Sequence, residues 1–391
     1  MPAAFDRETA ARLLEYFARR RGDVLALTRA LCEAESPSGD REGSRAVVRS
    51  VERAARSVPH VGAVERVEAA NGYGEHLRVT AFCDGVKDER TLLILGHTDT
   101  VHPRGSLSAR PWREEGGRIY APGIFDMKAA CAVALEALRA CGELGLRPRS
   151  PVRLLLTCDE ESGSYSGRAL VEEEARRAEH VLVLEPPAPG GRAKTARKGT
   201  GLFTMTVRGR ASHAGLEPEK GVSAVLELAR QVVRLHSLAD PSEGTTVSVG
   251  VISGGTHSNV VPAEARAEID VRFSTAEEAR RVEREIRGSA PFDERAQVEV
   301  SGGTNRPPLE RTPAAAELYE RARGIAEVLD FELGEASVGG ASDGNFAAAA
   351  GAAVLDGLGV DGGGAHAEHE HILADRVAPR GALLAALIAN L

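Results

Sequence analysis

Residues 92–99 read Leu-Leu-Ile-Leu-Gly-His-Thr-Asp, an apolar run that ends directly in an imidazole and a carboxylate. Similar runs occupy residues 152–156 and 181–184, and a later one occupies residues 352–355. The runs are short and mostly apolar, without regular alternation of apolar and polar residues. They are therefore typical of strands buried on both faces, as in a mostly parallel sheet.

Segments with a helical pattern of apolar residues lie around these runs, at residues 7–34, 127–138, 313–328 and 380–391. The second segment is apolar nearly all round, which suits a helix packed against a sheet. Together, the helices and the buried strands predict an α/β fold, with a mostly parallel mixed sheet flanked by helices.

The middle of the chain has a different pattern. Apolar and polar residues alternate with period two in four segments, at residues 202–207, 245–252, 265–273 and 298–300. Helical patterns fill the first and last gaps, at residues 223–238 and 275–287, and the second is expected to begin with a capping box formed by Ser274 and Glu277. The resulting order β-α-β-β-α-β predicts a ferredoxin-like α+β domain.

We expect this second domain to be inserted into the first, since a chain of 391 residues is long enough for two domains. Stretches rich in glycine and proline mark the boundaries near residues 186–199 and 301–308. The inserted domain is predicted to span residues 196–305. The larger domain is then discontinuous and comprises residues 1–195 and 306–391.

Composition excludes several classes of protein. With 42% hydrophobic and 27% charged residues, the chain is neither fibrous nor disordered. Its 49 basic and 57 acidic residues give a net charge of −8 without a basic stripe, so nucleic acid and anionic membranes are not expected partners. No apolar run approaches the roughly 18 residues that span a bilayer. Five cysteines without ligand spacing, and an N-terminal segment unlike a signal peptide, favour a cytoplasmic protein.

Acidic and imidazole residues follow the predicted buried strands where each strand ends. His97 and Asp99 follow the first strand, Glu160 and Glu161 follow the second, and Glu185 follows the third. Ligands of open α/β sheets bind at the carboxyl ends of the strands. We therefore expect these side chains to converge on one cleft.

Two further donors lie in loops. Asp126 opens the buried helix of the first half, and His366 lies in a glycine-rich loop after the last strand. Nitrogen and oxygen donors without thiolates suit Zn2+, with Co2+ or Mn2+ as substitutes. The five donors are too many for one tetrahedral zinc with an open position, but they fit two zinc ions that share a bridging carboxylate. The proposed donors are His97, Asp126, Glu161, Glu185 and His366.

Two such ions polarise a substrate carbonyl and activate water, and a water nucleophile also needs a proton carrier. Glu160 lies beside the proposed ligand Glu161, so it is the candidate general base that takes a proton from water and passes it to the leaving amine. Asp99 is expected to accept the other N–H of His97 and to hold its ring for the metal. Cys158 is the alternative nucleophile, in a cysteine hydrolase that would be indifferent to chelators.

Nine short segments together resemble the motifs of one known family. In chain order they are HTDTV, PGIFDMK, TCDEESGS, VLEPP, RASHAG, HSNVVP, DVRF, GGASD and GAHAEHE. The chain resembles the two-zinc exopeptidase and deacylase family, which includes glutamate carboxypeptidase, acetylornithine deacetylase, succinyl-diaminopimelate desuccinylase and aminoacylase. The resemblance implies a zinc-exopeptidase-like catalytic domain with an inserted lid and dimerisation domain.

The resemblance also implies a role for each donor. His97 would bind one zinc ion, Glu161 the other, and Asp126 both. Glu185 and His366 would complete the two coordination shells. The roles implied for Glu160 and Asp99 agree with those above. His369 and His371 lie in the same loop as His366, which is favoured because GAHAEHE matches the family motif.

Three residues of the inserted domain match substrate-side positions of the family. His213 resembles the lid histidine that reaches the active site of the partner subunit and stabilises the oxyanion. Asn259 resembles a residue that binds the oxyanion or the substrate carboxylate, and Arg272 resembles one that grips a carboxylate. Glu185, followed by proline, matches the glutamate-carboxypeptidase branch.

The prediction is a metal-dependent, carboxypeptidase-like hydrolase of short peptides or N-acyl amino acids that forms a homodimer through its lid domain. One alternative is a deacetylase or desuccinylase of the same family. Another, from a different class, is a catalytically silent binding scaffold.

Overall fold

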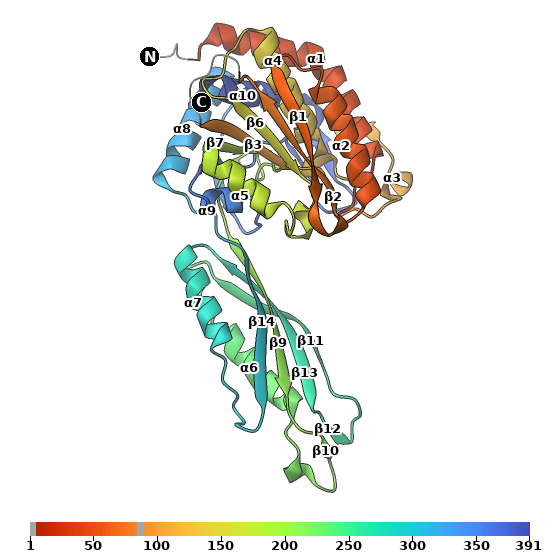
Figure 1. Cartoon of the computed structure of the whole chain (residues 1–391). Coiled ribbons are helices and arrows are strands. Elements are labelled where there is room, and N and C mark those ends of the chain that lie inside the picture. The colour runs from red at the N-terminus through yellow and green to blue at the C-terminus, as the bar shows by residue number, and fades with distance from the viewer. Residues whose placement is uncertain (1–4, 84–89) are drawn as a thin grey trace. The chain divides into compact units, whose positions relative to one another are not determined.

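The computed structural model describes residues 5–83 and 90–391. The chain divides into two compact units (Figure 1). The larger unit comprises Met1–Ala196, Arg311–Val338 and Ser342–Leu391. The smaller unit comprises Arg197–Glu310 and Gly339–Ala341.

The larger unit is built on a central sheet with the strand order β1-β2-β6-β3-β7-β16. The strands are β1 (Val61–Ala69), β2 (Gly74–Ala81), β3 (Thr91–His97), β6 (Val152–Thr157), β7 (Ala178–Val183) and β16 (Ala353–Leu355). Strands β6, β3, β7 and β16 pair in parallel, whereas β1 and β2 add antiparallel pairs at one edge. The four predicted apolar runs form the parallel part of this sheet, so the predicted fold class is confirmed.

Both faces of the parallel strands are covered by helices, and every residue of β3 is buried. The helices of this unit include α1 (Arg7–Glu33), α2 (Arg41–Ala55), α4 (Ala129–Glu143), α5 (Arg168–Arg177), α8 (Pro313–Val328), α9 (Asp343–Ala349) and α10 (Val377–Asn390). Helices α1, α4 and α10 pack on one another, and α4 contacts β3 (Figure 1). Helices α5 and α9 pack together and also contact β3. Because helices cover both faces of the sheet, the strand sequences are apolar without alternation.

A second, smaller sheet of the larger unit supports the glycine-rich loop. Its strand order is β17-β18-β5-β4, with β17 (Gly362–Gly363), β18 (His371–Leu373), β5 (Arg118–Tyr120) and β4 (Arg113–Glu115). Strands β17 and β18 are antiparallel neighbours, so the segment between them forms the connection of a hairpin. This connection contains His366.

The smaller unit is an antiparallel sheet with the strand order β11-β13-β9-β14 and two helices. Its main elements are β9 (Gly199–Arg208), α6 (Ala224–His236), β11 (Thr246–Gly254), β13 (Glu264–Phe273), α7 (Ala276–Arg287) and β14 (Gln297–Arg306). The predicted order β-α-β-β-α-β is confirmed. The apolar face of β13 is buried against α6 and α7, which is why its sequence alternates.

The predicted capping box of the second helix is wrong. Helix α7 begins at Ala276 and its N-cap is Thr275, whose side chain accepts the amide of Glu278 at 3.2 Å. The cap thus lies one residue later than Ser274, and Glu278 is at the third helical position instead of Glu277. The carboxylate of Glu278 bonds Arg281 instead of reaching back to the cap.

No helix in the described part of the chain combines the length and the apolar character needed to cross a bilayer.

Candidate metal centre

The structure brings the five proposed donors together at the carboxyl edge of the parallel strands. His97 is the last residue of β3. Glu161 lies in the turn Glu160–Ser162 after β6, and Glu185 follows β7 by two residues. Asp126 lies in the turn Ile124–Lys128 that leads into α4, and His366 reaches the group from the β17–β18 connection.

Asp126 belongs to two groups of donors at once. The ligand atoms of His97, Asp126 and Glu185 lie within 4.8 Å of one another, and so do those of Asp126, Glu161 and His366. Its Oδ1 is 3.2 Å from Nε2 of His97, whereas its Oδ2 is 3.4 Å from Nε2 of His366. The two oxygens of one carboxylate therefore face two different donor groups.

The remaining donors complete this arrangement. Oε1 of Glu185 is 3.6 Å from Nε2 of His97, and Oε2 of Glu161 is 3.0 Å from Nε2 of His366. The other oxygen of Glu161, Oε1, is buried and has no hydrogen-bond partner among residues 5–83 and 90–391. A buried carboxylate oxygen without a partner is costly unless a cation satisfies it. Imidazole and carboxylate donors suit zinc and similar divalent ions, so the residues fit a cation on each side of Asp126.

The carboxylates make this region strongly attractive to positive charge. The neighbouring carboxylates of Asp126 and Glu161 raise the pKa of His366 to about 10. Burial alone would lower the pKa of His97, but the carboxylates of Asp126 and Asp99 outweigh it and hold that pKa well above its ordinary value. A metal ligand must be a neutral imidazole, so a cation and these protons compete for the same nitrogens.

Asp99 lies between the His97 ring and the turn that carries Glu160 and Glu161. Nδ1 of His97 is 3.0 Å from the backbone oxygen of Asp99 and 3.4 Å from its Oδ1. The Asp99 carboxylate also accepts the amides of Glu160 and Glu161, each at 3.1 Å. Ser38 donates to the same carboxylate at 2.6 Å. Sequence reasoning missed Ser38, which had only the signal of a turn residue.

Glu370 holds the segment that presents Asp126. Its buried carboxylate accepts the amides of Gly123 and Phe125, each at 2.8 Å, and that of Asp126 at 3.0 Å. Its Oε2 is also 2.5 Å from Nε2 of His102. Sequence reasoning noticed Glu370 only as part of the GAHAEHE motif and gave it no role.

His366 is the histidine of its loop that lies among the donors. Its backbone φ is 63°, in the left-handed region that non-glycine residues seldom adopt, so the surrounding structure must hold it there. The His371 ring instead packs on Tyr120, with centroids 5.2 Å apart, and its Nδ1 is 2.9 Å from the backbone oxygen of His369.

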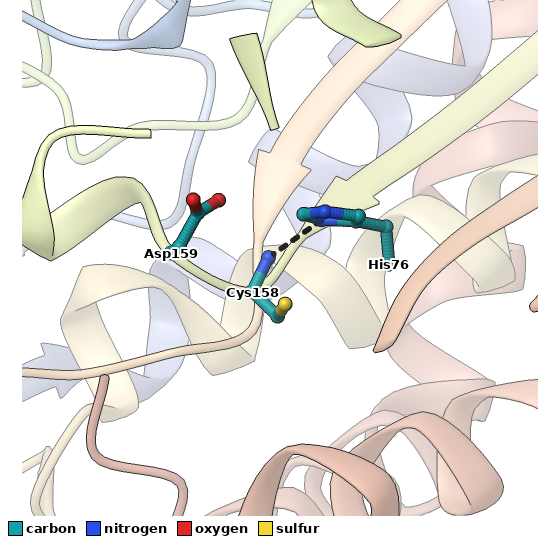
Figure 2. Close-up of side chains that lie close together, drawn as sticks. All are labelled: His76, Cys158 and Asp159. Atoms are coloured by element: carbon teal, nitrogen blue, oxygen red, sulfur yellow. Dashed lines mark hydrogen bonds between the residues drawn. The ribbon is translucent and has the colours of Figure 1, made fainter. Parts of the chain in front are cut away.

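Glu160, the candidate base, and Cys158, the alternative nucleophile, lie in the same loop after β6, but the surroundings of Cys158 do not suit a nucleophile. Glu160 is 7% exposed and directly precedes Glu161 in the same turn. Burial raises the pKa of the Cys158 thiol, which disfavours the reactive thiolate. The nearby ring of His76 accepts the backbone amide of Cys158 at 3.2 Å and does not activate its sulfur (Figure 2). This geometry argues against the cysteine-hydrolase alternative.

The three predicted substrate residues all belong to the smaller unit. His213 ends strand β10 (Ser212–His213), which pairs with β12 (Val260–Val261), and the amide of Ala214 donates to the backbone oxygen of Asn259 at 2.9 Å. His213 and Asn259 are therefore neighbours. Arg272 lies near the far end of β13 and makes two hydrogen bonds of 2.8 Å to Asp270.

The length of β13 separates Arg272 from the other two residues. Strand β12 adjoins the start of β13 at Glu264, and Arg272 lies eight residues further along the strand. At a rise of about 3.3 Å per residue, this places them roughly 26 Å apart. Within one copy of the smaller unit, Arg272 and the pair His213–Asn259 are too distant to contact the same bond of a small substrate.

The chain is similar to known proteins over much of its length. Residues 93–390 match the sequence profile of peptidase family M20/M25/M40. Carboxypeptidase G2 of Pseudomonas sp. (strain RS-16) is 32% identical over 301 residues, which cover 76% of this chain and 72% of that protein. Acetylornithine deacetylase of Myxococcus xanthus is 36% identical over 197 residues, which cover 46% of this chain and 49% of that protein.

Solved structures share the fold. Aminopeptidase PepT from Bacillus cereus ATCC 10987 has a TM-score of 0.76 at 24% identity and covers 94% of this chain and 98% of its own. The M20 family metallo-carboxypeptidase Sso-CP2 from Sulfolobus solfataricus has a TM-score of 0.67 at 16% identity, with 94% and 98% covered. The likeness extends over nearly the whole of each chain.

Proposed function

Because the chain belongs to peptidase family M20/M25/M40, we propose that it hydrolyses an amide bond in a short peptide or an N-acyl amino acid, with a preference for carboxypeptidase-like substrates. The family resemblance predicted from the sequence motifs is confirmed, and the chain is a hydrolytic enzyme. The observation that carries the proposal is the Asp126 carboxylate, whose two oxygens face two separate donor groups. The similarity to carboxypeptidase G2 supports the choice of substrate class.

Enzymes of this family depend on metal ions, and we propose two zinc ions for this chain. His97 and Glu185 would hold one ion, Glu161 and His366 would hold the other, and Asp126 would contact both. Co2+ or Mn2+ would serve as substitutes. When bound, the ions supply Lewis-acid activation of the substrate carbonyl and of water.

The chain's own carboxylates move the protons of the reaction. Glu160 takes a proton from the attacking water and donates it to the leaving amine, since it is buried beside Glu161 in the same turn. Asp99 orients the ring of His97 and, through the two amides that it accepts, also fixes the position of Glu160. Asp99 therefore contacts the proposed ligand His97 through its backbone oxygen and the proposed base Glu160 through its carboxylate.

The smaller unit would act as a lid that supplies the substrate contacts. Arg272 would exchange its two bonds to Asp270 for a bidentate contact with the substrate carboxylate. His213 and Asn259 would donate to the oxyanion that develops on the substrate carbonyl. Because Arg272 is roughly 26 Å from His213 along β13, two copies of the chain would contribute to each site, in a homodimer.

An exposed edge of the smaller unit suits this homodimer. Strand β11 is an edge of the sheet, and its Val251 and Ile252 are 54% and 58% exposed. Helix α6 contacts β11, and its Leu226 and Val233 are 55% and 73% exposed. An edge strand that presents apolar side chains is a template for pairing with a second copy.

We also propose a cytoplasmic location, because the five cysteines carry free thiols, which suits a reducing compartment.

The test is a substrate panel on zinc-loaded protein, with and without a chelator. It includes dipeptides and N-acyl amino acids, each with a free or an amidated terminal carboxylate. We expect chelator-sensitive hydrolysis of the free acids, and loss of this preference in Arg272→Ala but not in Arg266→Ala, an exposed arginine of the same strand. Hydrolysis of N-acetylornithine or N-succinyl compounds alone would favour the deacylase alternative, which the acetylornithine deacetylase similarity supports. Chelator-insensitive hydrolysis, or none with correctly loaded protein, would contradict the proposal.

A further inference from the structure

A buried imidazole lies beside the metal centre but outside both donor groups. His76 lies on β2 and is 2% exposed. In the antiparallel pair of β2 and β6, Leu77 lies opposite Leu156, so His76 reaches the point where β6 ends. The loop that follows β6 carries Glu160 and Glu161. His76 thus packs against the start of the loop on which the proposed reaction depends.

Both ring nitrogens of His76 are engaged by this loop. Nδ1 is 3.2 Å from the backbone nitrogen of Cys158, and Nε2 is 2.9 Å from Oγ of Ser166 (Figure 2 shows the first of these contacts). A backbone amide can only donate, so Nδ1 must carry the lone pair, and in the neutral ring Nε2 carries the hydrogen and donates to Ser166. Burial lowers the pKa of His76, which agrees with a neutral ring.

The two contacts fasten the loop at both of its ends. Cys158 begins the loop, and Ser166 lies just before α5. The amides of Ser166 and Gly167 also donate to the carboxylate of Asp159, at 2.6 Å and 3.2 Å. Held in this way at its beginning and its end, the loop leaves its acidic residues little freedom to shift.

A third metal site at this place is the competing interpretation, and the contacts argue against it. The ligand atoms of His76, Cys158 and Asp159 lie within 4.8 Å of one another. However, Nδ1 and Nε2 of the ring are already used by an amide and a hydroxyl, and the Asp159 carboxylate accepts backbone amides. Figure 2 shows the Cys158 sulfur pointing away from the Asp159 carboxylate. The cluster of His76, Cys158 and Asp159 is therefore a hydrogen-bonded structural contact and not a metal site.

We propose that His76 is a positioning residue for hydrolysis, which aims Glu160 and Glu161 by holding the Cys158 amide and the Ser166 hydroxyl. This inference rests on the proposed function, because it assigns His76 an effect through the general base and a ligand. His76 itself belongs to neither of the two donor groups around Asp126.

Substitutions that keep both, one or neither of the two hydrogen bonds of His76 distinguish a positioning role from a packing role. In His76→Asn the amide oxygen occupies a place close to Nδ1 and still accepts the Cys158 amide. In His76→Leu both contacts are lost, and in Ser166→Ala only the second is lost. His180→Leu is the matched control, because this half-buried histidine lies near the opposite, amino end of the strands, in β7.

The experiment measures kcat, KM, bound zinc and thermal unfolding for each variant, and the visible absorption spectrum of the Co2+-loaded protein. In His76→Leu we expect kcat to fall about 10- to 100-fold, because a misplaced Glu160 loses part of the roughly 10²- to 10⁴-fold that a general base contributes. KM and zinc content should stay near wild type, and the cobalt spectrum should change because the Glu161 ligand shifts. His76→Asn should retain most of kcat and the wild-type spectrum, Ser166→Ala should be intermediate, and His180→Leu should match wild type.

The proposal is overturned if His76→Leu keeps the kcat and cobalt spectrum of wild type, or if His76→Asn loses as much kcat as His76→Leu. If His76→Leu does not fold, Ser166→Ala is compared with His180→Leu. Equal kcat and equal cobalt spectra in these two variants would then overturn the proposal. A wild-type protein that hydrolyses no member of the panel would contradict the proposed function, whereas the cobalt spectra of the variants would still test the position of Glu161.

Discussion

The carboxylate of Glu370 accepts the backbone amide of Asp126 at 3.0 Å, although 244 residues separate them in the sequence. The same carboxylate accepts two further amides of that segment. The residue that faces both donor groups is therefore held from the loop that also carries His366. Through this contact, the loop that carries His366 also holds the backbone of Asp126 in the candidate metal centre.

Replacing Glu370 by Gln should weaken metal binding without changing any ligand. An amide NH2 in place of one carboxylate oxygen would face a backbone N–H, and two donors cannot bond each other. Losing support for a ligand typically lowers metal affinity about 10- to 100-fold. Competition with a chromophoric chelator measures this affinity. Glu368→Gln, an exposed change in the same loop, is the control. Equal affinities in all three proteins would show that Glu370 does not support the site.

Replacing Glu160 by Gln should abolish turnover and leave the metal in place. The amide cannot take the proton of the attacking water, and general-base catalysis contributes about 10²- to 10⁴-fold. Zinc analysis and kcat on the best substrate of the panel test this together. A variant that holds normal zinc and keeps near-normal kcat would rule out Glu160 as the base.

Metal-free protein should lose stability as the pH rises above neutral. Contacts with Asp126 and Glu161 raise the pKa of His366 from its usual 6.5 to about 10 in the folded protein. The stabilisation by protonated His366 is thus fully present below about pH 6.5 and is lost as the pH rises towards 10. Chemical denaturation of chelator-treated protein at several pH values measures the free energy of unfolding and its dependence on pH. His366→Ala should flatten this dependence, and an unchanged slope in that variant would contradict the assignment.

Mixing two inactive variants should restore activity if the chain forms the proposed homodimer with shared sites. Random mixing of Glu160→Gln and His213→Ala chains makes half of the dimers mixed, and one site in each mixed dimer has both residues intact, so roughly a quarter of wild-type activity should return. The mixture is unfolded and refolded together to exchange subunits. Mixing that restores nothing, with dimers present by light scattering, would show that His213 serves its own chain.

Part of the fold could be predicted from the sequence because its signals are local. The apolar runs that became β3, β6, β7 and β16 are buried on both faces and therefore lack alternation. Strands β1 and β2 were not predicted, since β1 is only partly buried and the two strands pair at the antiparallel edge. The cap of α7 was misplaced by one residue because Ser274 and Thr275 both have side chains that can cap a helix, and serine is the more favoured of the two.

The donors could be found from the sequence because strand ends gather at one edge of a parallel sheet. His97, Glu161 and Glu185 each follow such a strand. The residues that support them could not be found in this way. Glu370 acts on backbone amides far away in the sequence, and His76 lies on a strand that was not predicted. Contacts to backbone amides leave no spacing pattern that a single sequence would reveal.

Asp126 is proposed to bridge two cations. The direct test is the anomalous scattering of crystals of the zinc-loaded protein, measured on both sides of the zinc absorption edge. We expect two zinc peaks, one beside each oxygen of Asp126, with His97 and Glu185 on one and Glu161 and His366 on the other. A single peak, or zinc bound away from Asp126 in fully loaded protein, would show that Asp126 does not bridge two zinc ions.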